Sequence, residues 1–271
     1  MTPPTMAPPI PAARPGLLPA SAAFALLISI LVSVLAGASV PTPLYGVYQA
    51  AWGFSPFTTT LVFAVYAVAV LASLLTIGSL SDHVGRRPLL LAVLLASAVT
   101  MLLFARASGV ADLLVARLVQ GLATGGALGA LGAGLVDLDR AKGTIANAVA
   151  GPLGTATGGL VSGLFVQYLP APTHLVYWVM VGVFGIQAIG IAFMAETSEP
   201  TAGAWASLRP RLALPPATRR PFLFAAPALV ALWALAGFSG RSAPRSSGSS
   251  SARAPSCSAG SPSSPSRAPA D

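Results

Sequence analysis

The chain has 271 residues, of which 8% are charged and 55% are hydrophobic. A soluble domain carries charge on about one quarter of its residues, so this composition excludes a soluble protein. The formal net charge of +8 does not indicate nucleic-acid binding, because the basic residues lie between apolar segments and form no stripe on a soluble face. A single cysteine, Cys257, excludes an intrachain disulfide and a cysteine-based metal site.

Long apolar runs predict a bundle of membrane-spanning helices. Residues 1–20 are rich in Pro and Ala, and we expect them to form a disordered cytoplasmic tail. After this tail the apolar runs reach the roughly 20 residues that a helix needs to cross a bilayer, and they lack the alternation of barrel strands. Six spans and part of a seventh are predicted, at residues 21–40, 57–77, 89–105, 110–136, 145–168, 175–195 and 221–238.

Loop charges predict the orientation of these spans. With the N-terminus in the cytoplasm, the outside loops hold only one basic residue, Arg106. Nine basic residues then lie inside, namely Arg14, Arg86, Arg87, Arg140, Lys142, Arg209, Arg211, Arg219 and Arg220. This positive-inside bias predicts a multi-pass protein of the inner or plasma membrane of the cell. A cleaved signal peptide is the alternative for the first span, because Ala36-Gly37-Ala38 resembles a signal-peptidase site.

The C-terminal part of the chain changes character twice. Residues 196–220 are expected to form a cytoplasmic linker before the partial seventh helix at 221–238. Residues 239–271 are low in complexity and contain no aliphatic side chain larger than Ala. One interpretation is a natural disordered tail. We favour an out-of-frame tail, because the change interrupts an apolar run and GC-rich DNA read out of frame yields Ser, Pro, Ala, Arg and Gly.

A short charged segment separates the second and third predicted spans. It reads Gly-Ser-Leu-Ser-Asp-His-Val-Gly-Arg-Arg-Pro over residues 78–88. Gly85 can adopt the positive φ that reverses the chain, and Pro88 can open the third helix at its first position. Asp82 can pair with the two arginines that follow Gly85, or with helix ends. The alternative is an ordinary basic loop with a glycine turn.

This segment resembles the loop between the second and third helices of the major facilitator superfamily. The pattern of that family is Gly-x-Leu-x-Asp-x-x-Gly-Arg-Arg/Lys, and it is matched here by Gly78, Leu80, Asp82, Gly85, Arg86 and Arg87. His83 stands where the family usually has Arg or Lys. The resemblance implies an all-α polytopic membrane protein. Residues 21–195 would be the N-terminal six-helix bundle of the family, made of two inverted three-helix repeats and followed by a partial seventh helix.

A second motif lies in the fourth predicted span, where Arg117, Gly121 and Gly125 follow one another at four-residue intervals. An arginine in an apolar span costs about 2.5–3.5 kcal/mol on insertion scales and therefore marks a functional position, unless the side chain snorkels to the membrane edge. Small residues at this spacing let two helices pack closely. The family resemblance extends to this Arg-x-x-x-Gly-x-x-x-Gly pattern and implies a role in proton coupling.

The fifth span carries Gly151-Pro152 and, further along, Gly158-Gly159. Drug–proton antiporters of the superfamily carry a Gly-Pro-x-x-Gly-Gly signature on this helix. The two pairs are five residues apart here instead of two, so the match to the antiporter subclass is incomplete.

Other polar residues of the spans are further candidates. Asp137 and Asp139 lie where the fourth helix reaches the cytoplasm. We expect one of them, with Asp137 as the first candidate, to form a latch with the arginines of the charged segment. The alternative is a solvated loop charge. Four polar residues are candidates for a substrate path, although such residues are often plain interhelical hydrogen-bond partners. They are Tyr66, Gln120, Asn147 and Gln187.

No enzyme, metal site or cofactor is expected. The two histidines, His83 and His174, lie in different predicted loops, and no phosphate-binding loop or Ser/His/Asp arrangement is found in the sequence. The resemblance implies a secondary transporter that moves a small solute by alternating access and is coupled to protons, with the lipid bilayer as its surroundings. Export and uptake stay open as directions of transport, and export is the one we consider first.

The 271-residue chain corresponds to one half of such a transporter, so we expect it to transport nothing alone. One alternative is a half-size transporter that self-associates to rebuild the twelve-helix unit. The other is a non-transporting membrane scaffold or sensor.

Overall fold

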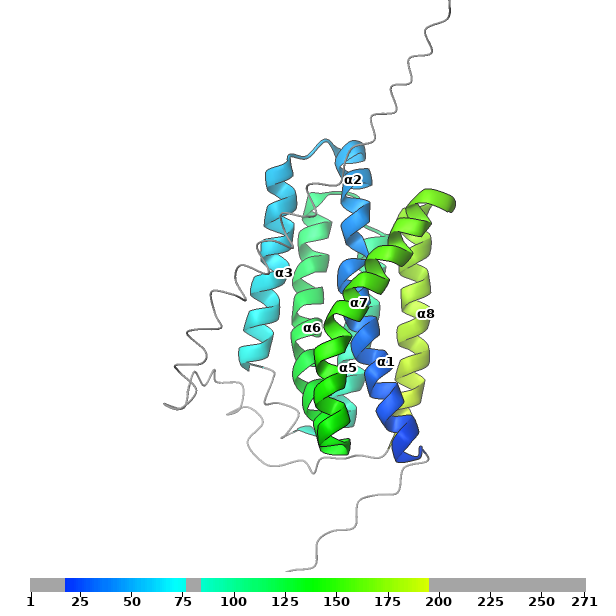
Figure 1. Ribbon diagram of the computed structural model, residues 1–271. Helices are drawn as coiled ribbons and strands as arrows, with labels where there is room; N and C mark the ends of the chain where they lie inside the picture. The colour runs from blue at the N-terminus through cyan, green and yellow to red at the C-terminus, as the bar shows by residue number, and fades with distance from the viewer. Residues whose placement is uncertain (1–17, 77–83, 195–271) are drawn as a thin grey trace, which may run out of the picture. The chain divides into compact units, whose positions relative to one another are not determined.

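The computed structural model describes residues 18–76 and 84–194, and these residues form helices and no strands (Figure 1). The helices are α1 (Ala20–Ser39), α2 (Pro41–Trp52), α3 (Pro56–Thr76), α5 (Arg86–Ala105), α6 (Val110–Leu138), α7 (Arg140–Tyr168) and α8 (Pro172–Ala192). The predicted linker, the partial seventh helix and the out-of-frame tail lie outside the described residues.

Six of the predicted spans are confirmed by the described helices. Six segments are long and apolar enough to cross a membrane, with α1 and α2 together forming the first. The observed bounds differ from the predicted ones by a few residues at most helix ends. The chain is thus a multi-pass membrane protein with an all-helical fold.

The first span is longer than the sequence indicated. The prediction ended it at residue 40, whereas helix continues to Trp52. Val40 keeps right-handed helical dihedrals, with φ −49° and ψ −44°, so the chain does not turn away at Pro41. Pro41 is the first residue of α2 and lacks an N–H group, so only one backbone hydrogen bond to the preceding turn is missing. The helical path therefore continues through Pro41 from α1 into α2.

Helix α6 lies at the centre of the packing. It contacts α3, α5, α1 and α7, while α8 packs mainly against α5 and α7 packs mainly against α1. The most apolar stretches of α3 and α7 are the least buried of the six spans. Figure 1 shows α3 at one edge of the bundle and α8 at the other. Residues on α6 are therefore the ones that several helices surround.

Candidate functional site

Arg117 lies in α6 and is completely buried, with 0% of its surface exposed. Its Nε donates a hydrogen bond to the Tyr45 hydroxyl at 2.6 Å. Its Nη1 donates to the Ala38 carbonyl at 3.0 Å and to Gln120 Oε1 at 2.6 Å. The side chain points into the bundle and does not snorkel to a membrane edge.

Four aromatic rings surround the guanidinium group. The Arg117 Cζ atom lies 5.2 Å from the ring centroid of Tyr66, 5.4 Å from those of Tyr45 and Phe63, and 5.6 Å from that of Phe104. Cations are attracted to such ring faces by about 0.5–2 kcal/mol each. We call Arg117, Gln120 and these four aromatic residues the Arg117 cluster.

The positive charge of the cluster has no acidic partner among residues 18–76 and 84–194. The two ion pairs found there both involve other residues. The Arg117 Nη2 atom is buried and also lacks a hydrogen-bond partner within the described chain. A buried cation without a counter-charge is costly, and the described residues leave this charge unbalanced.

The cluster is bonded to the junction between α1 and α2. Pro41 has no N–H to donate to the Gly37 carbonyl, and Gln120 Nε2 donates to that carbonyl at 2.9 Å instead. From α7, the Ser162 hydroxyl donates to the Val40 carbonyl at 2.7 Å. Arg117 also donates to the Ala38 carbonyl. Side chains of α6 and α7 thus form hydrogen bonds with three backbone carbonyl groups of the junction, those of Gly37, Ala38 and Val40.

Gly121 and Gly125 lie where α6 packs against α3. A Cβ atom at Gly121 would stand 2.6 Å from the Tyr66 carbonyl oxygen, and one at Gly125 would stand 2.6 Å from that of Val70. Such distances are shorter than real Cβ contacts, so only glycine allows this approach. The close packing brings α3, with Phe63 and Tyr66, up to the cluster on α6.

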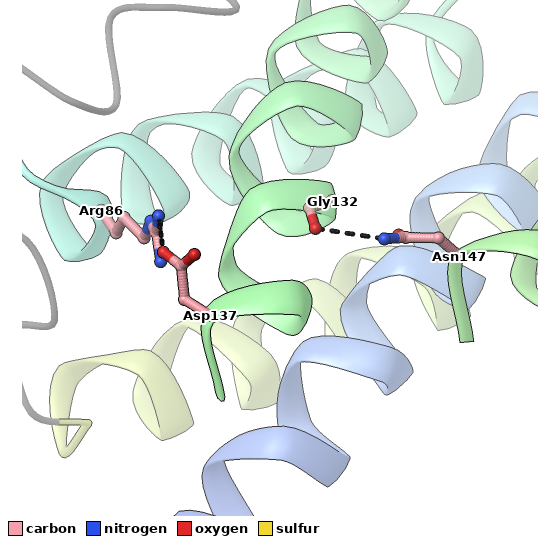
Figure 2. Close-up of polar contacts among 4 residues, drawn as sticks. All are labelled: Arg86, Gly132, Asp137 and Asn147. Carbon is pink, nitrogen blue, oxygen red and sulfur yellow. Dashed lines mark hydrogen bonds and ion pairs between the residues drawn. The ribbon is translucent and has the colours of Figure 1, made fainter. Parts of the chain in front are cut away.

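A second polar site lies at the end of the bundle where α6 finishes. Arg86 forms an ion pair with Asp137, as Figure 2 shows. The Arg86 side chain is 8% exposed and that of Asp137 is 57% exposed. Arg87 donates a hydrogen bond to the carbonyl oxygen of Ala192 on α8. The two arginines therefore tie the start of α5 to two different helices.

The charged segment is described only from Val84 onward. Gly85 has a φ of 96°, and α5 begins directly after it. Pro88 is consequently the third residue of this helix. The sequence predicted it at the first position. It is tolerated there because the first four N–H groups of a helix have no intrahelical partner. Gly78, Leu80 and Asp82 lie outside the described residues.

The four residues predicted for a substrate path fall into two groups. Tyr66 and Gln120 belong to the Arg117 cluster. Asn147 Nδ2 donates to the Gly132 carbonyl at 3.1 Å and joins α7 to α6 (Figure 2). Gln187 Nε2 donates to the Ser33 hydroxyl at 2.9 Å and joins α8 to α1. Asn147 and Gln187 are thus interhelical contacts away from the cluster.

Sequence reasoning missed Tyr45 and Ser162. Tyr45 was placed in an outside loop, because the first span was ended at residue 40. Ser162 follows Gly154 and Gly158 at intervals of four residues, so it lies on the same face of α7. Extending the small-residue spacing by one more step would have found it.

Asp139 caps α7 between two spans. Its Oδ1 accepts a hydrogen bond from the Lys142 backbone N–H at 3.0 Å, and its Oδ2 lies 3.2 Å from the Lys142 Nζ. These hydrogen bonds, the backbone one above all, lower the pKa of the Asp139 carboxyl group below its usual value. The carboxylate is therefore ionised at neutral pH and stabilises the helix start.

The sequence profile of the Major Facilitator Superfamily matches residues 22–247. The chain belongs to this superfamily of membrane transporters. Among solved structures, the human organic anion transporter MFSD10 (TETRAN) has a similar fold, with a TM-score of 0.51 and 20% sequence identity. The alignment covers 74% of this chain and 52% of MFSD10, so the chain spans about half the length of that transporter. No curated protein sequence matches the chain.

The superfamily assignment agrees with the geometry of the bundle. The likeness to MFSD10 shows the fold alone, because the two sequences are only 20% identical. In the order of the described spans, Arg117 lies on the fourth, and the Arg86–Asp137 pair joins the start of the third to the end of the fourth.

Proposed function

We propose that this bundle is half of a transporter that moves a small solute across the cell membrane by alternating access, coupled to protons and directed toward export. The observation that supports the proposal is Arg117, a fully buried cation inside a membrane bundle without an acidic partner in the described chain. An apolar side chain would fill the same space without the insertion cost of about 2.5–3.5 kcal/mol. The charge is therefore kept for a purpose other than packing.

Arg117 supplies the positive member of a charge pair whose negative member is exchanged during the transport cycle. The charge that varies belongs to its partner. A solute with a negative group, or an acidic residue that gains and loses a proton, would supply it. Among the described residues the aspartates lie only at or near helix ends. We propose that the solute or a second six-helix unit supplies this partner.

The Arg86–Asp137 pair supports the alternating part of the proposal. It joins the start of α5 to the end of α6, at the end of the bundle for which the loop charges predict a cytoplasmic location. An ion pair between a nearly buried arginine and a half-exposed aspartate can break when the helix ends separate. We propose that the pair latches the cytoplasmic side of the bundle in one of the two states.

Proteoliposome flux tests the proposal. The 271-residue chain is reconstituted alone and together with the polypeptide encoded by the DNA just downstream, in the frame that continues the apolar spans. Uptake of a panel of radiolabelled organic anions and cations is then measured under an imposed pH gradient. We expect gradient-driven flux from the combination and none from the chain alone.

Each departure from that result has a defined meaning. Flux from the chain alone, accompanied by cysteine crosslinking between two copies, would favour a self-associating half-transporter. An absence of flux in both arms, with helical protein present in the vesicles, would contradict the proposed transport function and favour the scaffold or sensor.

A further inference from the structure

A groove runs between α1 and α7 on the outside of the bundle. The two helices cross, as Figure 1 shows, and they touch most closely at Gly154 and Gly158. A Cβ atom at Gly154 would stand 2.7 Å from the Val32 carbonyl oxygen. Away from this crossing the helices diverge toward their N-termini and leave a wedge of about 320 Å³. Glycine packing thus creates the groove and closes one of its ends.

The walls of the groove are apolar along its length. The helix α1 side supplies Phe24, Ile28 and Val32, and α7 supplies apolar side chains from Ile145 to Leu153. Ile145 is 65% exposed and Val149 is 53% exposed, so the protein covers neither. In a membrane protein such side chains face the hydrocarbon of the lipids. A concave apolar surface makes more van der Waals contacts with a flexible acyl chain than a flat surface does.

The length of the groove matches one leaflet of a bilayer. From Lys142 to Leu153 helix α7 rises by about 16 Å at 1.5 Å per residue. Half of the hydrocarbon core is about 15 Å thick. The length of the groove therefore fits an acyl chain that spans one leaflet.

Lys142 is the one charged residue that lines the groove, and it lies at the open end. Its side chain is 75% exposed and pairs with Asp139, while the neighbouring Arg140 is exposed on the same turn. The three side chains leave a net charge of +1 beside the apolar walls. A basic mouth on an apolar groove between helices is the arrangement that attracts anionic head groups.

We propose that the groove binds one anionic phospholipid, with an acyl chain along α1 and α7 and the phosphate at Lys142. This inference does not depend on transport, because it rests on the groove and its charge alone. Lys142 contributes attraction and the apolar wall contributes dispersion, so the two parts can be separated by substitution. The phosphate competes with the carboxylate of Asp139, whose side chain is 35% exposed, for the lysine ammonium group.

Native mass spectrometry of the purified full chain tests the proposal. Equal amounts of dioleoyl phosphatidylglycerol and dioleoyl phosphatidylcholine are added in mild detergent, and the retained lipid is counted. We expect the wild-type chain to retain the anionic lipid preferentially. Lys142→Gln should lower this preference about fivefold, which corresponds to about 1 kcal/mol for one lysine at the membrane surface.

Substitutions of matched exposure control for general effects. Val149→Trp fills the groove and should lower the retention of both lipids several-fold. Val115→Trp lies at a position of α6 with 52% exposure outside the groove and should retain lipid as the wild type does. Arg106→Gln, which removes an exposed charge from a different loop, should leave the lipid preference unchanged.

Three results would overturn the proposal. One is equal retention of the two lipids by the wild-type chain. Another is wild-type retention by both Lys142→Gln and Val149→Trp. The third is a dimer mass without lipid that Val149→Trp abolishes, because the occupant of the groove would then be a second copy of the chain.

Discussion

Two adjacent glycines of α7, Gly158 and Gly159, should differ in how substitution by alanine affects the stability of the bundle. A Cβ atom at Gly158 would stand 2.7 Å from the Ala36 carbonyl carbon and from its Cα, at least 0.7 Å short of an ordinary contact of 3.4 Å. These atoms are backbone, so α1 itself must move to make room. A Cβ atom at Gly159 would meet nothing within 4 Å. Gly158→Ala should therefore destabilise the bundle, and Gly159→Ala should not.

The expected loss for Gly158→Ala is about 1–3 kcal/mol, the usual cost of overpacking. This lowers the folding equilibrium constant roughly 5- to 150-fold. Both substitutions raise helix propensity by the same amount, so their difference isolates the contact with α1. The free energy of unfolding is measured by circular dichroism during titration of micelles with sodium dodecyl sulfate. Equal stability of the two variants would refute the proposed contact.

Three further predictions concern charged residues. Asp137→Arg removes the ion pair with Arg86 and should cost about 1 kcal/mol, which speeds amide exchange at the start of α5 and the end of α6 about fivefold. The double substitution Arg86→Asp with Asp137→Arg should restore the wild-type exchange rate. An unchanged rate in Asp137→Arg would count against a latch. The pKa of Asp139 is lower in the folded protein than in the unfolded chain, where it is about 3.9. The Asp139 carboxylate therefore stabilises α7 fully above the unfolded pKa. This stabilisation is lost as the pH falls through the folded pKa. Protection factors at the start of α7 should fall with acid in the wild type and not in Asp139→Ala. In a background without the native cysteine, impermeant maleimide should label Arg106→Cys but not Arg140→Cys on intact cells, and the reverse pattern would place the N-terminus outside.

The sequence was sufficient for the spans because lipid imposes a simple requirement on them. Each helix must satisfy its own backbone groups and be apolar for about 20 residues, and both properties are local. The junction at Val40 was misjudged because Pro41 follows the apolar run directly, and a proline can either end a helix or begin a further helical segment. Whether helix continues past Pro41 depends on carbonyl partners from α6 and α7, which are distant in sequence.

The candidate site was predicted only in part for the same reason. Arg117 stands out in an apolar span, so its type and position were enough to select it. Its partners, such as Tyr45, Phe63 and Phe104, are ordinary aromatic residues of other helices and carry no local signal. Gln120 and Gln187 look alike in the sequence, and only the packing of the helices separates one from the other.

The most direct test of a transport role for Arg117 is gradient-driven solute flux by variants at this one position. In proteoliposomes that contain the chain together with the polypeptide encoded just downstream, in the frame that continues the apolar spans, Arg117→Gln should abolish flux. Circular dichroism should show an unchanged helix content. Arg106→Gln, at an exposed position on a loop, should transport as the wild type does. Undiminished flux from folded Arg117→Gln would contradict the account, because the buried charge would then have no part in transport.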